Sequence, residues 1–420
     1  MKIMFLGLGA SSLSIIKIPY NISLIMTLLC IAIVGYVNKW SYNMILDIYE
    51  EKMENKKDIN NYKDILFKYE YKFKYKYIGP IIKFVSHIIL ILYSVGEIII
   101  HQILIYRTIG GIINILGGYM YIYTSQFLSE SFLGKTGWKV LINFTILILI
   151  IIPSNLLYIN NIDKKTDLSS VIGFFIIIFI VLSIIVESIF YLILFVKEEG
   201  HNWVDINFYH VEKGFTKKLY FFQSLGILFF CFSGHSGLIQ IIKNIESDDV
   251  IERKLEHERI YIYSNLFNSL IYLCISIFGY FSMPIDVVDI ITERKIIWSN
   301  DIIMTIIRFL IIPISINKIQ INCNILKDTN NYNNNIKYLI IVLLFVTTLI
   351  SSFYQNIVFY ITFIGGLISF PAFFIPPIMY NHYYEPNKCR FKVIIRYIIG
   401  SVLLIVGFIS SIMALIDLKK

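Results

Sequence analysis

Long apolar stretches separated by shorter polar segments dominate the hydrophobic pattern of the chain. A bilayer core about 30 Å thick requires about 20 apolar residues per helix, and stretches of about that length recur throughout the sequence. The pattern predicts about eleven transmembrane helices, near residues 3–18, 23–46, 84–106, 138–157, 168–196, 219–243, 261–283, 301–318, 336–354, 356–381 and 391–416. A re-entrant or interfacial helix is expected over the glycine-rich stretch 107–130. The chain is therefore expected to be an all-α polytopic membrane protein.

Composition agrees with this pattern and excludes other classes of protein. Apolar residues make up 57% of the chain and charged residues only 16%, whereas soluble domains carry about 25% charged residues. The net charge of +8 is expected to reflect loop residues sorted by membrane topology, so no nucleic-acid partner is predicted. The five cysteines are scattered, without the spacing of a disulfide framework or a metal site. No cofactor and no metal are expected.

The distribution of lysine and arginine predicts the orientation in the membrane. With the N-terminus in the cytosol, 17 of these residues fall in cytosolic segments and 10 in external ones, as the positive-inside rule requires. The highly charged segment 47–79 is then a cytosolic loop between the second and third helices of a single membrane domain, residues 1–420. The plasma membrane and the membrane of a vacuole or lysosome-like organelle both fit this prediction.

Small polar residues interrupt two of the apolar stretches. The first stretch holds the run GLGASSLS, residues 7–14, and the sixth holds a polar island, SGHSG, at residues 233–237. Irregular backbone is tolerated in a bilayer only where it is buried in protein or lines a cavity, so unwound turns here would offer main-chain groups to a ligand. The alternatives are close packing of small residues for the first run and a structural hydrogen bond between helices for His235.

The two interruptions lie five helices apart. That spacing is typical of a LeuT-like 5+5 inverted repeat, in which the broken helices 1 and 6 face each other at the midplane of the membrane. Helix N-termini at such breaks attract a carboxylate and unwound carbonyls attract an ammonium group, so a zwitterionic amino acid suits them. The predicted substrate-binding residues are Gly9, Ala10, Ser11, Ser12 and Leu13 in the first helix and Phe232, Ser233, Gly234 and His235 in the sixth.

Five short motifs follow one another along the chain: GASSLSII (9–16), PSNL (153–156), FCFSGHSGLIQI (230–241), YLCISIFGYF (272–281) and GGLISFPAFFIP (365–376). Together they resemble the amino acid/auxin permease family, eukaryotic amino acid transporters of the amino acid–polyamine–organocation superfamily. The first motif departs from the family pattern, with Ser11 at a glycine position and Ile16 at a proline position. The resemblance implies an amino acid permease that works by alternating access, either by symport or facilitatively.

Ionisable residues inside predicted helices are candidates for carrying a coupling proton. Glu97 and His101 lie one turn apart in the third helix, so they share a face and can form a hydrogen bond. The alternative is a self-neutralising pair that lowers the cost of membrane insertion. Glu187 in the fifth helix is a further candidate, with Arg308 as a partner to be tested.

Two further alternatives concern the coupling ion and the class of activity. In sodium-coupled members of the family a Ser or Thr on the eighth helix helps to bind the ion, but the run RFLIIP, residues 308–313, offers no hydroxyl. The resemblance therefore implies proton coupling or facilitated transport rather than sodium coupling. The enzyme alternative is a membrane-bound acyltransferase that uses His235 as general base, with Asn265 or Asn268 as a second polar group.

Overall fold

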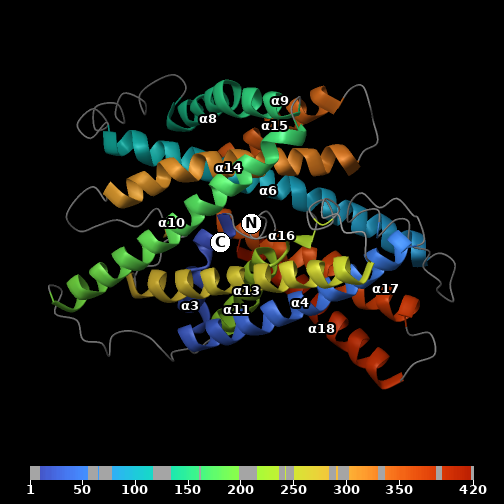
Figure 1. Ribbon diagram of the computed structural model, residues 1–420. Coiled ribbons are helices and arrows are strands. Elements are labelled where there is room, and N and C mark those ends of the chain that lie inside the picture. Colours follow the sequence, from blue (N-terminus) through green and yellow to red (C-terminus); the bar gives the residue numbers. More distant parts are fainter. Residues whose placement is uncertain are drawn as a thin grey trace. The chain divides into compact units, whose positions relative to one another are not determined.

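The fold is described from a computed structural model of the 420-residue chain (Figure 1). The described residues are 10–54, 65, 78–116, 134–159, 162–197, 215–235, 242, 250–282, 290–291, 302–329, 336–384 and 390–417. Within these residues the regular secondary structure is helical, without a β-strand. The prediction of an all-α polytopic membrane protein is confirmed.

Every predicted membrane segment contains a described helix. In order they are α2 (Ala10–Ser14), α3 (Lys17–Ile22), α4 (Leu24–Glu54), α6 (Ile78–Leu116), α8 (Gly134–Ile146), η1 (Leu147–Ile151), α9 (Ile152–Ile159), α10 (Ile162–Lys197), α11 (Phe215–Cys231), α13 (Val250–Ser282), α14 (Ile302–Thr329), α15 (Ile336–Phe353), α16 (Ile357–Ser369), η4 (Phe370–Phe374), α17 (Ile375–Tyr384) and α18 (Arg390–Asp417). Among the described residues, 8 helical stretches are long and apolar enough to cross a membrane. Two shorter apolar helices, Tyr220–Cys231 and Tyr338–Phe353, accompany them.

Several helices extend beyond the ends of their apolar stretches, and two of them continue into segments predicted to have another structure. α4 ends at Glu54, inside the segment 47–79 predicted as a loop, and α6 ends at Leu116, inside the stretch 107–130 predicted as re-entrant or interfacial. Charged side chains near the end of α4 have partners on a neighbouring helix, since Asp47 pairs with Lys254 of α13. These partners allow the helix to continue where the hydrophobic pattern stops. Residues 117–130 lie outside the described residues.

The chain divides into two compact units. Unit 1 contains residues Met1–Tyr93, Ile184–Val287 and Val358–Lys420, and unit 2 contains Ser94–Ser183 and Val288–Ile357. In unit 1, α4 packs alongside α13, and α11 packs against α3 and α18 (Figure 1). In unit 2, α8 packs against α15 and α9 against α14. Both units expose large apolar side chains, such as Phe84 and Leu149, as lipid-facing helices do.

Small residues bring α11 close to its neighbours in unit 1. A Cβ atom added to Gly365 of α16 would clash with the carbonyl oxygen of Gly226 in α11. A Cβ atom added to Gly226 would clash with the Ser410 hydroxyl of α18. Close approach through glycine and serine is typical of helix packing in membranes, where lipid supplies no hydrophobic driving force between helices. The sixth segment is therefore held at a defined position by its glycines.

The first segment is interrupted, but not where the glycines and serines predict. The unwinding expected over residues 9–13 is wrong for Ala10 to Leu13, which lie in α2, and Gly9 lies outside the described residues. The turn falls instead at Ile15 and Ile16. Proline lacks an amide hydrogen, so Pro19 cannot satisfy the carbonyl four residues earlier, that of Ile15. That carbonyl accepts a hydrogen bond from the amide of Ile18 instead, at 3.1 Å.

Prolines also accompany the two π-helical turns. η1 directly precedes α9, which contains Pro153, and η4 contains Pro371. Removing an amide donor from a helix favours a locally widened turn, and such turns are frequent at functional sites. Around η4 the main chain also interacts with a neighbouring helix, because the Ser41 hydroxyl of α4 donates a hydrogen bond to the carbonyl of Ala372.

Candidate functional site

The sixth segment breaks within the polar island that the sequence singles out. α11 ends at Cys231, and the next three residues, Phe232 to Gly234, are not helical. The Ser233 amide hydrogen-bonds to the Phe230 carbonyl at 3.2 Å, and the Ser233 hydroxyl donates to the same carbonyl at 2.6 Å. From α13, the Tyr272 hydroxyl donates to the Cys231 carbonyl at 2.8 Å. The interruption is thus stabilised by hydrogen bonds from the Ser233 amide and hydroxyl and from the Tyr272 hydroxyl. Ser236 and Gly237 lie outside the described residues.

Ser233 also connects the interruption to α6. Its hydroxyl lies 3.1 Å from the Tyr93 hydroxyl, and the Ser233 side chain is completely buried. The Tyr93 ring packs against the ring of Phe230, with centroids 5.7 Å apart. The broken turn therefore contacts the third membrane segment through both a hydrogen bond and an aromatic contact.

His235 is held by polar and aromatic neighbours. Its Nε2 lies 3.3 Å from the Ser41 oxygen. Because the Ser41 hydroxyl donates its proton to the Ala372 carbonyl, the Ser41 oxygen accepts, which places a proton on Nε2 of the histidine. The imidazole ring lies 4.2 Å from the Tyr42 ring and 5.7 Å from the Phe373 ring, between centroids. His235 thus joins the interruption to α4 and η4.

The first segment packs against the sixth, as the predicted site requires. Both α2 and α3 contact α11, and α2 also contacts α13. Asn21 of α3 donates a hydrogen bond of 3.4 Å to the Ser224 hydroxyl of α11. The side chains of Ser12 and Leu13 are buried. The helices that carry or directly precede the two runs selected from the sequence therefore pack against each other in unit 1.

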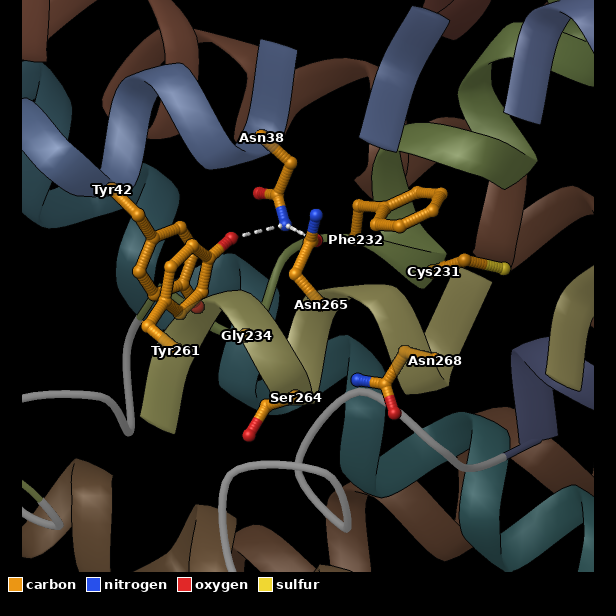
Figure 2. A pocket seen from close by; sticks show the side chains of 9 residues that line it. All are labelled: Asn38, Tyr42, Cys231, Phe232, Gly234, Tyr261, Ser264, Asn265 and Asn268. Atoms are coloured by element: carbon orange, nitrogen blue, oxygen red, sulfur yellow. Dashed lines mark hydrogen bonds between the residues drawn. The ribbon is translucent and has the colours of Figure 1, made fainter. Parts of the chain in front are cut away.

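Beside the interruption, α4 and α13 enclose a polar cavity (Figure 2). Its volume is about 20 Å³, and it is lined by Asn38, Tyr42, Cys231, Phe232, Gly234, Tyr261, Ser264, Asn265 and Asn268. Tyr42 and Tyr261 stack face to face, with ring centroids 3.9 Å apart. Asn38 donates hydrogen bonds of 2.9 Å to the Tyr261 hydroxyl and to the Asn265 side-chain oxygen. From the sequence, Asn265 and Asn268 are candidates only for an enzyme, and Asn38 is not a candidate.

The predicted pair Glu97 and His101 belongs to a larger buried cluster in unit 2. The Glu97 Oε2 atom lies 3.9 Å from His101 Nε2 and accepts a hydrogen bond of 3.0 Å from Asn322 of α14. Asn322 also donates to the Lys318 carbonyl at 3.0 Å. Lys318 is only 3% exposed, and it gives no signal in the sequence because this single lysine lies near the predicted end of an apolar run. The Lys318 side chain also interacts electrostatically with Glu97 and His101, so the cluster joins a carboxylate, an imidazole and a buried lysine on two helices.

The remaining predicted proton site, Glu187, is buried in α10. Its suggested partner Arg308 belongs to the other unit. The Arg308 guanidinium lies close to Gly111 within unit 2. Pairing between Glu187 and Arg308 stays a prediction.

A second ionic cluster, which the sequence did not reveal, joins the ends of α4 and α13. Glu50 accepts hydrogen bonds of 3.1 and 2.9 Å from Arg253 through one oxygen, and its other oxygen lies 2.7 Å from His257 Nδ1. The side chains of Glu50 and His257 are 4% and 1% exposed. Their positions in sequence are more than 200 residues apart. No short-range signal could therefore have paired them.

A bundle of membrane-length helices with a helix interrupted at a buried polar site is the architecture of a membrane transporter. Residues 19–418 match the family described as "Transmembrane amino acid transporter protein", so the chain belongs to this family of amino acid transporters. No curated protein matches the chain. The resemblance seen in the motifs is confirmed, although GASSLSII lies before the matched residues. The acyltransferase alternative is wrong, because the family is one of transporters and not of enzymes.

Proposed function

We propose that the chain is a secondary active transporter that moves amino acids by alternating access in a LeuT-like 5+5 inverted repeat. The observation that carries the proposal is the interruption of the sixth segment at Phe232–Gly234, which lies beside a polar cavity and follows a helix, α11, that packs against the first segment. A broken helix leaves main-chain groups that an intact helix would use for itself. In a membrane such groups bind substrate with little dependence on its side chain.

The substrate's amino and carboxylate groups are assigned to the two interrupted segments. The proposed residues are Gly9, Ala10, Ser11, Ser12 and Leu13 in the first segment and Phe232, Ser233, Gly234 and His235 in the sixth. In the first segment Ala10 to Leu13 belong to α2, so there the site would be at the end of this short helix, next to the turn at Ile15 and Ile16. The contact of α2 and α3 with α11 supports this assignment. His235 acts here as a positioning residue, because its ring bridges α4 and η4.

Gly234 provides the sharpest test of the substrate site. Gly234→Phe would fill the interruption, and uptake of labelled amino acids into proteoliposomes is expected to fall to background. Gly110→Phe is the matched control, since a Cβ atom on Gly110 meets nothing within 4 Å, and its uptake is expected to stay close to that of the wild type. Equal uptake by both variants would show that the interruption of α11 is not the site.

Proton coupling is assigned to the cluster of Glu97, His101, Lys318 and Asn322. A buried carboxylate shared between an imidazole and an amide donor can bind and release a proton as its surroundings change. Glu187 is kept as a second proton site. Sodium is not required by this proposal, since the run 308–313, on the same helix as Lys318, offers no hydroxyl.

Proton coupling is tested by uptake under an imposed pH gradient, compared with exchange at equal pH. Glu97→Gln is expected to abolish gradient-driven accumulation while exchange continues. Glu256→Gln, which removes an exposed carboxylate from α13, is the control and is expected to accumulate substrate normally. Wild-type protein that exchanges amino acids but never concentrates them under the gradient would establish the facilitative alternative.

The cytosolic location of the N-terminus also belongs to the proposal. It is supported by the excess of lysine and arginine in the segments placed inside. Single-cysteine labelling within the segment 55–77 would report its side of the membrane in intact vesicles. Plasma membrane and a vacuole or lysosome-like organelle remain the two proposed locations.

A further inference from the structure

We propose that Ser41 of α4 is a positioning residue for transport, which fixes His235 and, through it, the downstream end of the interruption in the sixth segment. This inference rests on the proposed function, because it concerns the main-chain groups of Phe232–Gly234 to which the substrate is assigned. It adds a residue that is not among the predicted site residues. It also gives a role to two adjacent prolines in the tenth segment, which comprises α16, η4 and α17.

The usual main-chain donors for the Ala372 carbonyl are missing. An α-helical hydrogen bond would need an amide hydrogen from Pro376 and a π-helical one would need it from Pro377, and proline has none. The amide of Ile375, three residues on, donates to the Phe370 carbonyl instead. A buried carbonyl needs a partner, and Ala372 is completely buried. Its donor therefore has to come from another helix.

Ser41 supplies that donor and thereby determines the state of His235. The Ser41 hydroxyl has one hydrogen, which goes to the Ala372 carbonyl, since a carbonyl can only accept. The Ser41 oxygen is therefore an acceptor toward Nε2 of His235, 3.3 Å away, and the histidine carries a proton on that nitrogen. Two prolines of the tenth segment thus fix the tautomer of a histidine in the sixth segment through one serine.

The His235 ring is also confined by its neighbours. Its centroid lies 4.2 Å from that of the Tyr42 ring and 5.7 Å from that of the Phe373 ring. The side chains of Ser41, His235 and Phe373 are all buried. In a close-packed interior a side chain keeps the orientation that its hydrogen bond and its neighbours give it. Because His235 directly follows Gly234, a fixed ring fixes the end of the interruption.

The two ends of the interruption are held by different groups. At the upstream end, the hydroxyls of Tyr272 and Ser233 donate to carbonyls of α11. At the downstream end, Ser41 acts through His235. The main chain between them is assigned to the amino and carboxylate groups, which all amino acids share. Loss of the Ser41 hydroxyl is therefore expected to weaken the binding of every substrate to the same degree, whereas a residue that selects a side chain would weaken some substrates more than others.

Ser41→Ala tests this role through the kinetics of uptake into proteoliposomes, measured with labelled alanine and with labelled leucine. The apparent KM is expected to rise about tenfold for both, while the maximal rate per folded protein stays within about twofold, because the lost interaction holds the bound state. Ser41→Thr keeps the hydroxyl and is expected to restore the KM. An unchanged KM in Ser41→Ala, or a rise confined to one of the two substrates, would overturn the proposal.

Ser411→Ala is the matched control. Ser411 of α18 is also buried, and its hydroxyl also donates to a carbonyl of the tenth segment, that of Phe363, at 2.8 Å. The residue four positions after Phe363 is Leu367, which has an amide hydrogen, so this carbonyl does not depend on the serine. Ser411→Ala is expected to leave the KM unchanged. A KM raised as much as in Ser41→Ala would show that any lost contact to the tenth segment has this effect, against the proposal.

A double-mutant cycle determines whether Ser41 acts through His235. If it does, Ser41→Ala and His235→Ala share one effect, and the double variant is expected to have the KM of His235→Ala alone. Effects on the KM that multiply in the double variant would show that the two residues act separately, and the positioning role would be wrong.

Pro376→Ala separates positioning from folding. It gives the Ala372 carbonyl an amide hydrogen from its own helix, so it is expected to raise the folded yield of Ser41→Ala while the KM stays high. Restoration of the KM as well would mean that Ser41 only satisfies a carbonyl, which would overturn the proposal. If Ser41→Ala alone does not fold, the cycle is measured in the Pro376→Ala background. Failure of the wild-type protein to take up any amino acid would instead overturn the proposed function itself.

Discussion

Helices α4 and α13 share two groups of buried polar side chains, one near the middle of the membrane span of α4 and one at its end. The two groups differ in how their hydrogen-bonding atoms are satisfied. Asn38 lies near the middle of the span Leu24–Glu50, and Glu50 ends it, about 18 Å further along the helix. Around Asn38 all side chains that line the cavity are uncharged. Around Glu50 an acid, a guanidinium and an imidazole lie in contact.

The difference between the two groups is in the use of their oxygen atoms. Both oxygens of Glu50 have partners, one from Arg253 and one from His257. The oxygens of Asn38 and Asn268 have none among the described residues. A fully engaged group stabilises the fold, whereas the amide group lines the cavity beside the interruption at which the substrate is proposed to bind. We therefore expect changes at the ionic group to alter stability and changes at the amide group to alter transport.

The largest effect is expected from breaking the ionic group. Glu50→Ala leaves Arg253 and His257 without their shared carboxylate, and removal of one partner from a buried pair costs about 3–5 kcal/mol of stability. The loss would appear as a lower midpoint of thermal unfolding in detergent. Glu256→Ala, an exposed change on α13, should leave the midpoint in place. A normal midpoint for Glu50→Ala would remove the distinction between the two groups.

A smaller loss of stability, with a change in transport, is expected for Asn265→Leu. The substitution removes the hydrogen bonds of Asn265 to Asn38 and to the Gly35 carbonyl. Leaving such buried groups unsatisfied costs about 1–3 kcal/mol. Thermal unfolding together with uptake of labelled amino acids into proteoliposomes would measure both effects. A changed midpoint with unchanged uptake per folded protein would indicate that the amide group does not take part in transport.

Tyr261→Phe should have a milder effect. It deletes the hydroxyl that accepts a hydrogen bond from Asn38 but keeps the ring that stacks on Tyr42. The expected loss of stability is about 1 kcal/mol, with a moderate fall in amino acid uptake. Tyr263→Phe, on an exposed ring of the same helix, is the matched control. A larger effect than that of Asn265→Leu would reverse the proposed order within the amide group.

The smallest effect is expected at the edge of the ionic group. Lys254 pairs with Asp47 at 2.6 Å, but the lysine side chain is 42% exposed. Exposed ion pairs contribute about 0–1 kcal/mol, so Lys254→Met should barely move the unfolding midpoint. A loss as large as that of Glu50→Ala would mean that the outer pair, and not the buried one, joins the two helices.

The sequence by itself determined the class of protein. Apolar stretches of membrane length predicted the helices, because a helix is the structure that satisfies its own backbone in lipid. The polar island at residues 233–237 predicted the interruption of the sixth segment, and the motifs indicated the family. These are local signals, in which neighbours along the chain carry the information.

The tertiary structure decided which polar groups meet. Glu50 finds Arg253, and Asn38 finds Asn265, only because α4 packs alongside α13. The position of the first break depends on Pro19, whose missing amide hydrogen matters more than the glycines and serines before it. The role of Lys318 likewise depends on Glu97 and Asn322, which belong to the same buried cluster. A hydrophobic pattern predicts that a residue is buried, but the pairing of buried hydrogen-bond donors and acceptors depends on helices distant in sequence.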